Sequence, residues 1–279
     1  MGRVRPADYV LGIAGLALLR RWLGGDRGRA EEIERLVGEL GRGPAGVEFE
    51  LPELDVRAGY AAWVGTYDTM PNPLIRIEET VVRALIDESP AGHALDAACG
   101  TGRHAAYLTA RGHRVIGVDA VPEMLAAARA RHPGIDFREG SLAALPVDTA
   151  SADLAVCALA CSHLPDLAPA LAELGRVVRP GGRVIVSDFH PANFLIGGQA
   201  LFQAADGGYA FVRSYPHGPG DYVPAAIAAG LEVRRCLEPC WGEDEVPLMA
   251  GPLFALAPET FRAALVGIPG AVVWEFGRR

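Results

Sequence analysis

The stretch that decides the fold is Ala94-Leu-Asp-Ala-Ala-Cys-Gly-Thr-Gly-Arg103, in which a short apolar strand runs into a glycine-rich turn. Gly100 and Gly102 let a ligand approach the backbone closely, and a helix begins directly after them. The next apolar strand ends in Asp119, and a carboxylate at that position can bind both hydroxyls of a ribose. The pattern predicts a nucleotide-type cofactor at the ends of two neighbouring strands.

Outward from this loop, short apolar strands alternate with helices. We expect strands at 93–98, 114–118, 135–138, 152–159, 183–188, 231–236 and 271–276, and helices at 103–111, 122–131, 167–178 and 221–229. Such alternation is typical of an α/β protein with a Rossmann-like, doubly wound and mostly parallel sheet of seven strands. The last strand is expected to enter the sheet antiparallel.

The chain before this pattern is predicted to be helical. Two helices at 8–23 and 29–40 are joined by a turn that contains Gly24, Gly25 and Gly28, and a third helix spans about 75–86. We therefore divide the chain into an N-terminal helical extension, residues 1–55, and a Rossmann-like domain, residues 56–279.

Two late segments, 189–219 and 238–269, do not follow the alternation. The first is rich in glycine, proline, histidine and aromatic residues, and the second has a predicted helix near Thr260. Long irregular segments in a compact domain commonly serve as functional lids, so both are interpreted as lids.

Composition restricts the class of partner. The chain has 279 residues, is 50% hydrophobic and carries a net charge of -8, with an isoelectric point near 5.4. An acidic chain binds a phosphate backbone poorly, so DNA and RNA are not expected as substrates. We expect a small-molecule acceptor and a monomer or homodimer.

Cysteine usage and the N-terminus indicate a cytoplasmic protein. Five cysteines, an odd number in a chain of this length, do not suggest a disulfide framework. The Cys-x3-Cys spacings differ from those of common zinc sites, so no metal is expected. An apolar run at 9–19 is followed at once by Arg20 and Arg21, without a cleavage site, and is too short to cross a membrane.

The position of Asp96 discriminates between cofactors. Gly100-x-Gly102-x-x-Ala105 formally matches a dinucleotide fingerprint. However, the carboxylate of Asp96, on the strand just before the loop, would repel a pyrophosphate and suits an ammonium group. S-adenosylmethionine carries a sulfonium and an ammonium and no phosphate, so it is the favoured cofactor, with S-adenosylhomocysteine as its product.

The stretch from Ala94 to Asp188 resembles the class I S-adenosylmethionine-dependent methyltransferases of the ubiquinone/menaquinone type, the methyltransferase type 11-like group. The segments that carry the resemblance are Leu95-Asp-Ala-Ala-Cys-Gly-Thr-Gly102, Gly117-Val-Asp119 with Met124, Asp153-Leu-Ala-Val with His163-Leu-Pro, and Glu173 through Arg179-Pro-Gly-Gly182 to Asp188. Residues 1–55 carry none of it. The chain departs from the pattern at Ala98, where the family has glycine, and at Ser141, where it often has an acid.

The expected cofactor contacts follow from the strand-end pattern and from the resemblance. Asp96 and Arg103 are expected at the methionine end, where Arg103 either binds the carboxylate or is simply exposed. Met124 and Leu142 are expected to enclose the adenine. The full set is Tyr67, Asp96, Ala98, Gly100, Gly102, Arg103, Asp119, Met124, Ser141, Leu142, Ala158 and His163.

Methyl transfer depends mainly on positioning the nucleophile, with a general base only where the acceptor must lose a proton. His163 and His190 follow strands at the expected ligand edge and are the candidate bases, and each can equally be structural. Trp63, Phe189, His217 and Trp241 are the candidate substrate contacts. The aromatic content suggests an apolar or aromatic acceptor, methylated on oxygen or nitrogen, with carbon also open.

Two other functions remain open on the sequence. One is an enzyme that binds S-adenosylmethionine without transferring methyl, of the pericyclase type. The other is an NAD(P)-dependent oxidoreductase on the same fold.

Overall fold

The computed structural model describes residues 2–24, 27–40 and 43–279. Its centre is a seven-stranded sheet with the order β11-β12-β8-β7-β4-β5-β6. The strands are β4 (His93–Ala97), β5 (Arg114–Asp119), β6 (Asp136–Glu139), β7 (Ala152–Ala158), β8 (Val178–Phe189), β11 (Leu231–Leu237) and β12 (Ala271–Arg278). The predicted α/β fold and its seven strands are confirmed.

The strand directions also agree with the prediction. Strands β6, β5, β4, β7 and β8 pair in parallel, whereas β12 lies antiparallel between β8 and β11. Strand β8 begins at Val178, earlier than expected, because the Arg-Pro-Gly-Gly segment continues the ladder toward β7 with a shift in register.

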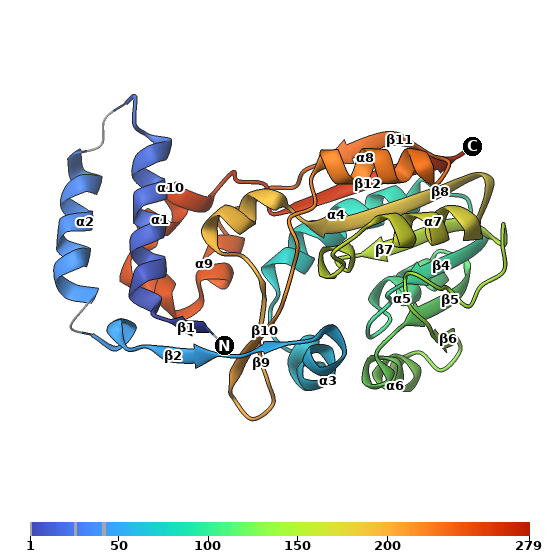
Figure 1. Cartoon of the computed structure of the whole chain (residues 1–279), viewed down its shortest axis with the longest axis horizontal. Helices are drawn as coiled ribbons and strands as arrows, with labels where there is room; N and C mark the ends of the chain where they lie inside the picture. The colour runs from blue at the N-terminus through green and yellow to red at the C-terminus, as the bar shows by residue number, and fades with distance from the viewer. Residues whose placement is uncertain (1, 25–26, 41–42) are drawn as a thin grey trace.

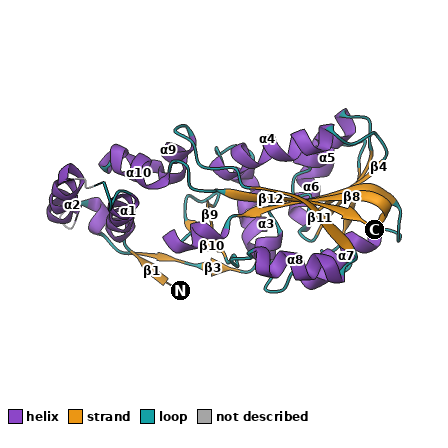
Figure 2. Cartoon of the chain, turned by 90° about the horizontal axis from the view of Figure 1, so that it is seen from above, coloured by secondary structure: helices purple, strands orange, loops and turns teal. Residues whose placement is uncertain are grey.

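Helices cover both faces of the sheet. Helices α4 (Pro73–Asp87), α5 (Arg103–Ala110) and α6 (Pro122–Arg131) bury one face, and α7 (Ala168–Val177) and α8 (Pro219–Ala228) bury the other. Figure 2 shows α4 and α5 on the side of the sheet opposite to α7 and α8. Adjacent residues such as Ala94 and Leu95 belong to different clusters because side chains alternate along a strand.

A second apolar cluster joins the two ends of the chain. Helix α1 (Pro6–Arg20) packs on α10 (Pro258–Leu265), with α2 (Arg27–Leu40) and α9 (Glu245–Ala250) beside them, at the end of the molecule away from the sheet (Figure 1). Arg20 donates hydrogen bonds to the carbonyls of Ala263, Ala264 and Val266 at the end of α10. We call this group of helices the helical module. Gly25, in the predicted turn between α1 and α2, lies outside the described residues.

The expectation that residues 189–219 are irregular is wrong in part. Strands β9 (Ala200–Gln203) and β10 (Tyr209–Val212) form an antiparallel pair, and β3 (Glu53–Leu54) adds to β10 in parallel. Strands β1 (Gly2–Val4) and β2 (Phe49–Leu51) form another small pair. Short strands with glycines between them gave too little alternation to be recognised.

The segment 238–269 is part of the helical module. It contributes α9, α10 and the buried Trp241 and Phe261. The division of the chain at residue 55 and the motion of both lid segments stay predictions. Among the described residues, no helix combines the length and apolar character that crossing a bilayer requires.

Candidate functional site

The glycine loop follows β4 at the carboxyl edge of the parallel strands. Ala98, Gly100 and Gly102 all have positive φ angles, of 58°, 54° and 87°. A Cβ atom added to Gly100 would meet nothing within 4 Å, so the backbone there is open to a ligand. At Gly102 an added Cβ would contact His132 and Phe137 at 3.0 Å, so this glycine serves close packing.

Asp119 closes the loop from the neighbouring strand. Its Oδ2 accepts a hydrogen bond from Gly100 N at 2.7 Å, and its Oδ1 accepts one from Val121 N at 2.9 Å. Burial raises the pKa of Asp119, and the backbone N–H groups oppose this effect. The carboxylate is therefore fixed at the end of β5, as the sequence predicts, and retains lone pairs for a diol.

Asp96 has two roles open to it. It is buried and lines the cleft, while its Oδ2 accepts a hydrogen bond from Ala105 N at 2.7 Å and so caps α5 from the preceding strand. Burial raises the pKa of Asp96 to about 6, against the effects of His104 and of the Ala105 N–H. The capping contact occupies one oxygen and leaves the other for a ligand cation.

A fully buried acid on α4, which the sequence analysis missed, holds the start of α5. Glu78 accepts hydrogen bonds from Arg103 at 3.0 Å and from the Ser187 hydroxyl at 2.7 Å, and lies 3.3 Å from His104 Nε2. Burial acts to raise the pKa of Glu78, but Arg103 and His104 bring it down to about 2. Glu78, Val82 and Leu85 have i, i+4, i+7 spacing and so lie on the apolar face of this helix. An acid at such a position indicates a buried, paired charge, and the sequence could have identified Glu78 in this way.

The cleft itself is small, about 30 Å³. It is lined by Tyr67, Asp96, Ala98, Cys99, Gly100, Thr101, Arg103, His104 and Ala158. Of the expected cofactor residues, Tyr67, Asp96, Ala98, Gly100, Arg103 and Ala158 are thus brought together. Met124 is buried on α6, and Ser141 and Leu142 follow β6, so these three residues lie outside this lining.

Helix α3 (Val56–Tyr67) contributes Tyr67 to the cleft lining, and Asp68, which caps the C-terminus of the helix, anchors it to the glycine loop. Asp68 accepts a hydrogen bond from the Thr101 hydroxyl at 2.9 Å and forms an ion pair with Arg131 of α6. Trp63 of the same helix stacks on Phe202 of β9, with ring centroids 4.9 Å apart. Burial raises the pKa of Tyr67 to about 12, so its hydroxyl stays protonated.

His163 forms a dyad with Tyr60 of α3. His163 Nδ1 lies 2.9 Å from the Arg213 carbonyl oxygen and therefore carries the proton, so Nε2 accepts from the Tyr60 hydroxyl at 2.8 Å. Burial lowers the pKa of His163, which favours the neutral ring. The short helix that carries His163 is fixed by Asp188, which accepts a hydrogen bond from Ser162 N.

The remaining predicted site residues have protein partners elsewhere. His190 Nδ1 accepts from Ala192 N, and its Nε2 lies 3.0 Å from Glu238 Oε1. His217 Nε2 donates to the Leu164 carbonyl, and Phe189 packs beside Phe194. Trp241 is 2% exposed in the helical module. These positions do not bring the four residues to the cleft.

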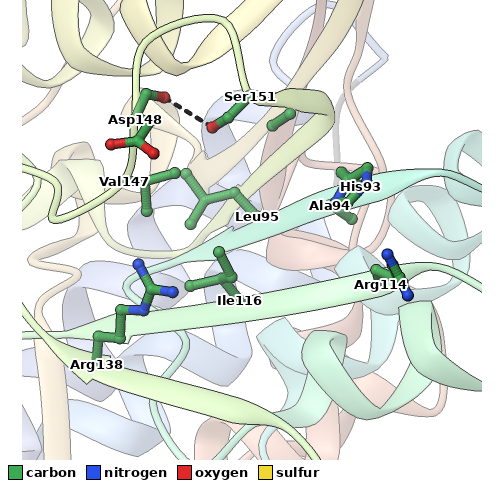
Figure 3. A pocket seen from close by; sticks show the side chains of 10 residues that line it. His93, Ala94, Leu95, Arg114, Ile116, Arg138, Val147, Asp148 and Ser151 are labelled. Atoms are coloured by element: carbon green, nitrogen blue, oxygen red, sulfur yellow. Dashed lines mark hydrogen bonds between the residues drawn. The ribbon is translucent and has the colours of Figure 1, made fainter.

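A larger hollow, of about 120 Å³, lies near the amino ends of β4, β5 and β7. Figure 3 shows Leu95, Ile116 and Val147 pointing toward one another there, with Arg138 beside them. The glycine loop is at the other edge of the sheet, so this hollow is separate from the cleft. No cluster of three or more metal-ligating side chains occurs among the described residues.

Comparison with known proteins identifies the domain. Residues 95–186 match the family described as a methyltransferase domain. This stretch is a class I S-adenosylmethionine-dependent methyltransferase domain. It contains the glycine loop, Asp96 and Asp119, and the strands from β4 to most of β8.

Curated relatives match this chain over more residues than the domain model does. A probable S-adenosylmethionine-dependent methyltransferase of Mycolicibacterium smegmatis is 39% identical over 42% of this chain and 45% of its own length. The demethylmenaquinone methyltransferase of Deinococcus radiodurans is 36% identical over 50% of this chain and 62% of its own. The chain thus spans about half the length of these curated relatives.

A solved structure supports the fold of the same domain. The S-adenosylmethionine-dependent methyltransferase of Mesorhizobium loti superposes with a TM-score of 0.55 at 23% identity, over 72% of this chain and 98% of its own. The Rossmann-like fold assignment is thereby confirmed.

Proposed function

We propose that this protein transfers the methyl group of S-adenosylmethionine to a nucleophilic atom of a small molecule. The observation that carries the proposal is the pairing of a ligand-accessible glycine loop with two buried carboxylates, Asp96 and Asp119, at the ends of adjacent strands. A pyrophosphate would face Asp96 at close range, so the same arrangement disfavours a dinucleotide.

The donor set fits the cofactor. Asp119 is suited to the ribose hydroxyls, Asp96 to the ammonium, and Arg103 to the carboxylate, because each side chain keeps unused lone pairs or N–H groups. When bound, S-adenosylmethionine supplies an electrophilic methyl group on a sulfonium. The chain supplies orientation and exclusion of water through α3, whose Tyr67 lines the cleft and whose Tyr60 and Trp63 pack on Tyr67.

The Tyr60–His163 dyad is the proposed route for a proton. A neutral His163 with Nε2 directed at Tyr60 accepts the phenolic proton as Tyr60 takes one from an acceptor hydroxyl or ammonium. Oxygen and nitrogen acceptors are therefore favoured over carbon. The aromatic residues of α3 suit an apolar or aromatic acceptor. We place the protein in the cytoplasm, as a monomer or homodimer without nucleic-acid or membrane partners.

Calorimetry with S-adenosylmethionine, S-adenosylhomocysteine and NADH tests the cofactor. Both adenosyl ligands are expected to bind at micromolar concentration, and Asp119→Ala is expected to abolish binding. Asp136→Ala is the matched control, because Asp136 is an exposed acid of β6 paired with Arg138. Binding of NADH alone would make the protein an oxidoreductase.

Acceptor screening separates methyl transfer from a reaction that keeps the methyl group. A panel of phenols and amines is incubated with S-adenosylmethionine, and release of S-adenosylhomocysteine is measured. Tyr60→Phe is expected to lower kcat about 100-fold without changing S-adenosylmethionine affinity, since base catalysis contributes on that order. Cofactor binding without methyl release for any acceptor would favour the pericyclase-type alternative.

A further inference from the structure

His104, the second residue of α5, brings an unsatisfied nitrogen to the cleft. The side chain is 3% exposed and belongs to the cleft lining. Its Nδ1 is buried and has no hydrogen-bond partner among the residues that the structure describes. Buried polar atoms are normally paired, so an orphan nitrogen beside a ligand cleft points to a partner on the ligand.

Glu78 determines what this nitrogen can do. With its pKa near 2, the Glu78 carboxylate is ionised and can only accept hydrogen bonds. The proton of His104 must therefore reside on Nε2, 3.3 Å from Glu78 Oε1. In the neutral ring, Nδ1 is left with a free lone pair and is an acceptor.

The cleft then has two chemically different ends. Arg103 and the first N–H groups of α5 form a positive end that suits a carboxylate. Asp96 and His104 Nδ1 form an acceptor end that suits an ammonium. An α-amino acid in its zwitterionic form presents both groups, whereas an adenosine alone presents neither.

We propose that His104 Nδ1 accepts a hydrogen bond from the α-ammonium of the cofactor's methionine end, beside Asp96. Glu78 is the positioning residue that fixes the His104 proton and directs Arg103 toward the carboxylate. This inference rests on the proposed function, because it assumes that an adenosyl amino acid occupies the cleft.

A calorimetric test with four ligands distinguishes the two ends of the cleft. They are S-adenosylhomocysteine, its decarboxylated amine, its deaminated carboxylate, and 5′-methylthioadenosine, which lacks both groups. Wild-type protein is expected to bind the amine more tightly than methylthioadenosine. Failure of all four to bind would overturn the proposed function together with this inference.

Two substitutions of His104 isolate its Nδ1. The amide oxygen of Asn can occupy the Nδ1 position, whereas Gln reproduces Nε2 and lacks the nearer acceptor. His104→Gln is expected to lower the affinity for both amine-bearing ligands about tenfold, the effect of losing one hydrogen bond to a charged group. The affinities for the other two ligands should not change. His104→Asn should restore most of that loss. Equal effects of His104→Gln on all four ligands would show a merely structural role.

Glu78→Gln, compared with Glu79→Gln, tests the positioning role. Both acids contact Arg103, but only Glu78 also contacts His104. Glu78→Gln is expected to lower the affinity ratio of S-adenosylhomocysteine to methylthioadenosine about tenfold, and Glu79→Gln to leave it within about twofold. Thermal unfolding confirms that each variant is folded. If Glu78→Gln does not fold, the two His104 variants decide the inference, and an unchanged ratio in folded Glu78→Gln overturns the role of Glu78.

Discussion

The Thr101 hydroxyl donates a 2.9 Å hydrogen bond to Asp68, and this contact joins the helix above the cleft to the loop that forms its floor. Asp68 also pairs with Arg131, so α3, the glycine loop and α6 meet at one carboxylate. We therefore expect cofactor binding and the position of α3 to be coupled through this contact.

Thr101→Val removes the hydroxyl with little change in shape. We expect S-adenosylhomocysteine affinity to fall about three- to tenfold, the equivalent of one hydrogen bond, and α3 amides to exchange hydrogen faster. Calorimetry and hydrogen exchange measure the two effects. Thr109→Val, which removes a hydroxyl bonded within α5, is the control. Unchanged exchange in α3 would contradict the coupling.

Ala98 has a φ angle of 58°, in the left-handed region that favours glycine. Ala98→Gly relieves about 1 kcal/mol of backbone strain in the folded state. The substitution also raises the conformational entropy of the unfolded chain, but this opposing effect is smaller. We therefore expect the free energy of unfolding to rise by up to about 1 kcal/mol. Urea denaturation measures it. Ala97→Gly, one residue earlier in ordinary strand geometry, should destabilise the protein instead. A loss of stability in both variants would refute the strain argument.

The ionisation of Asp96 is expected to lower the stability of the protein and to raise its affinity for the cofactor as pH rises. Its pKa of about 6 in the folded protein exceeds the ordinary 3.8, so the folded state binds the proton more tightly. Stability is thus lost as pH rises from about 4 to 6, by up to about 3 kcal/mol. S-adenosylhomocysteine affinity should rise over the same window, because its ammonium prefers the ionised carboxylate.

Asp96→Asn checks both effects, since the amide oxygen can still accept from Ala105 N. The difference in urea unfolding between wild type and variant should vary with pH between about 4 and 6 and be constant above. Methylthioadenosine lacks the ammonium, so its affinity should not change with pH in this way. A wild-type affinity for S-adenosylhomocysteine that is flat across the window would count against the assigned contact.

Trp241 donates a 2.9 Å hydrogen bond through Nε1 to Asn193 Oδ1 inside the helical module. Trp241→Phe leaves that buried oxygen unpaired, so we expect the free energy of unfolding to fall by about 1–3 kcal/mol. Ligand affinity and kcat should not change. Trp63→Phe, on the helix above the cleft, is the comparison and should alter KM for the acceptor. A changed KM for the acceptor in Trp241→Phe would instead indicate that Trp241 contacts the substrate.

The sheet was predictable because the pattern that forms it is local. Short apolar strands, such as the one around Leu95, alternate with helices and so predict a parallel sheet. The strand ends then place Asp96 and Asp119 at one edge. Boundaries differed mainly where a turn continues a ladder, as at Val178.

The supporting residues of the site were not predictable in the same way. Trp241 bonds to Asn193, 48 positions earlier, and an aromatic residue in a proline-rich segment looks the same whether it lines a pocket or fills a core. Glu78 meets Ser187 across 109 positions. Such pairs depend on tertiary contacts, which hydrophobic periodicity does not encode.

The packing of α1 on α10 sets an order of events during synthesis. Residues 6–20 leave the ribosome well before residues 258–265, which cover their apolar face, are made. Arg20 likewise meets its carbonyl partners only once residues 263–266 have emerged. The apolar surface of α1 thus stays uncovered by α10 while the roughly 240 residues between them are made, so we expect this helix to be a binding segment for a chaperone at the exit tunnel.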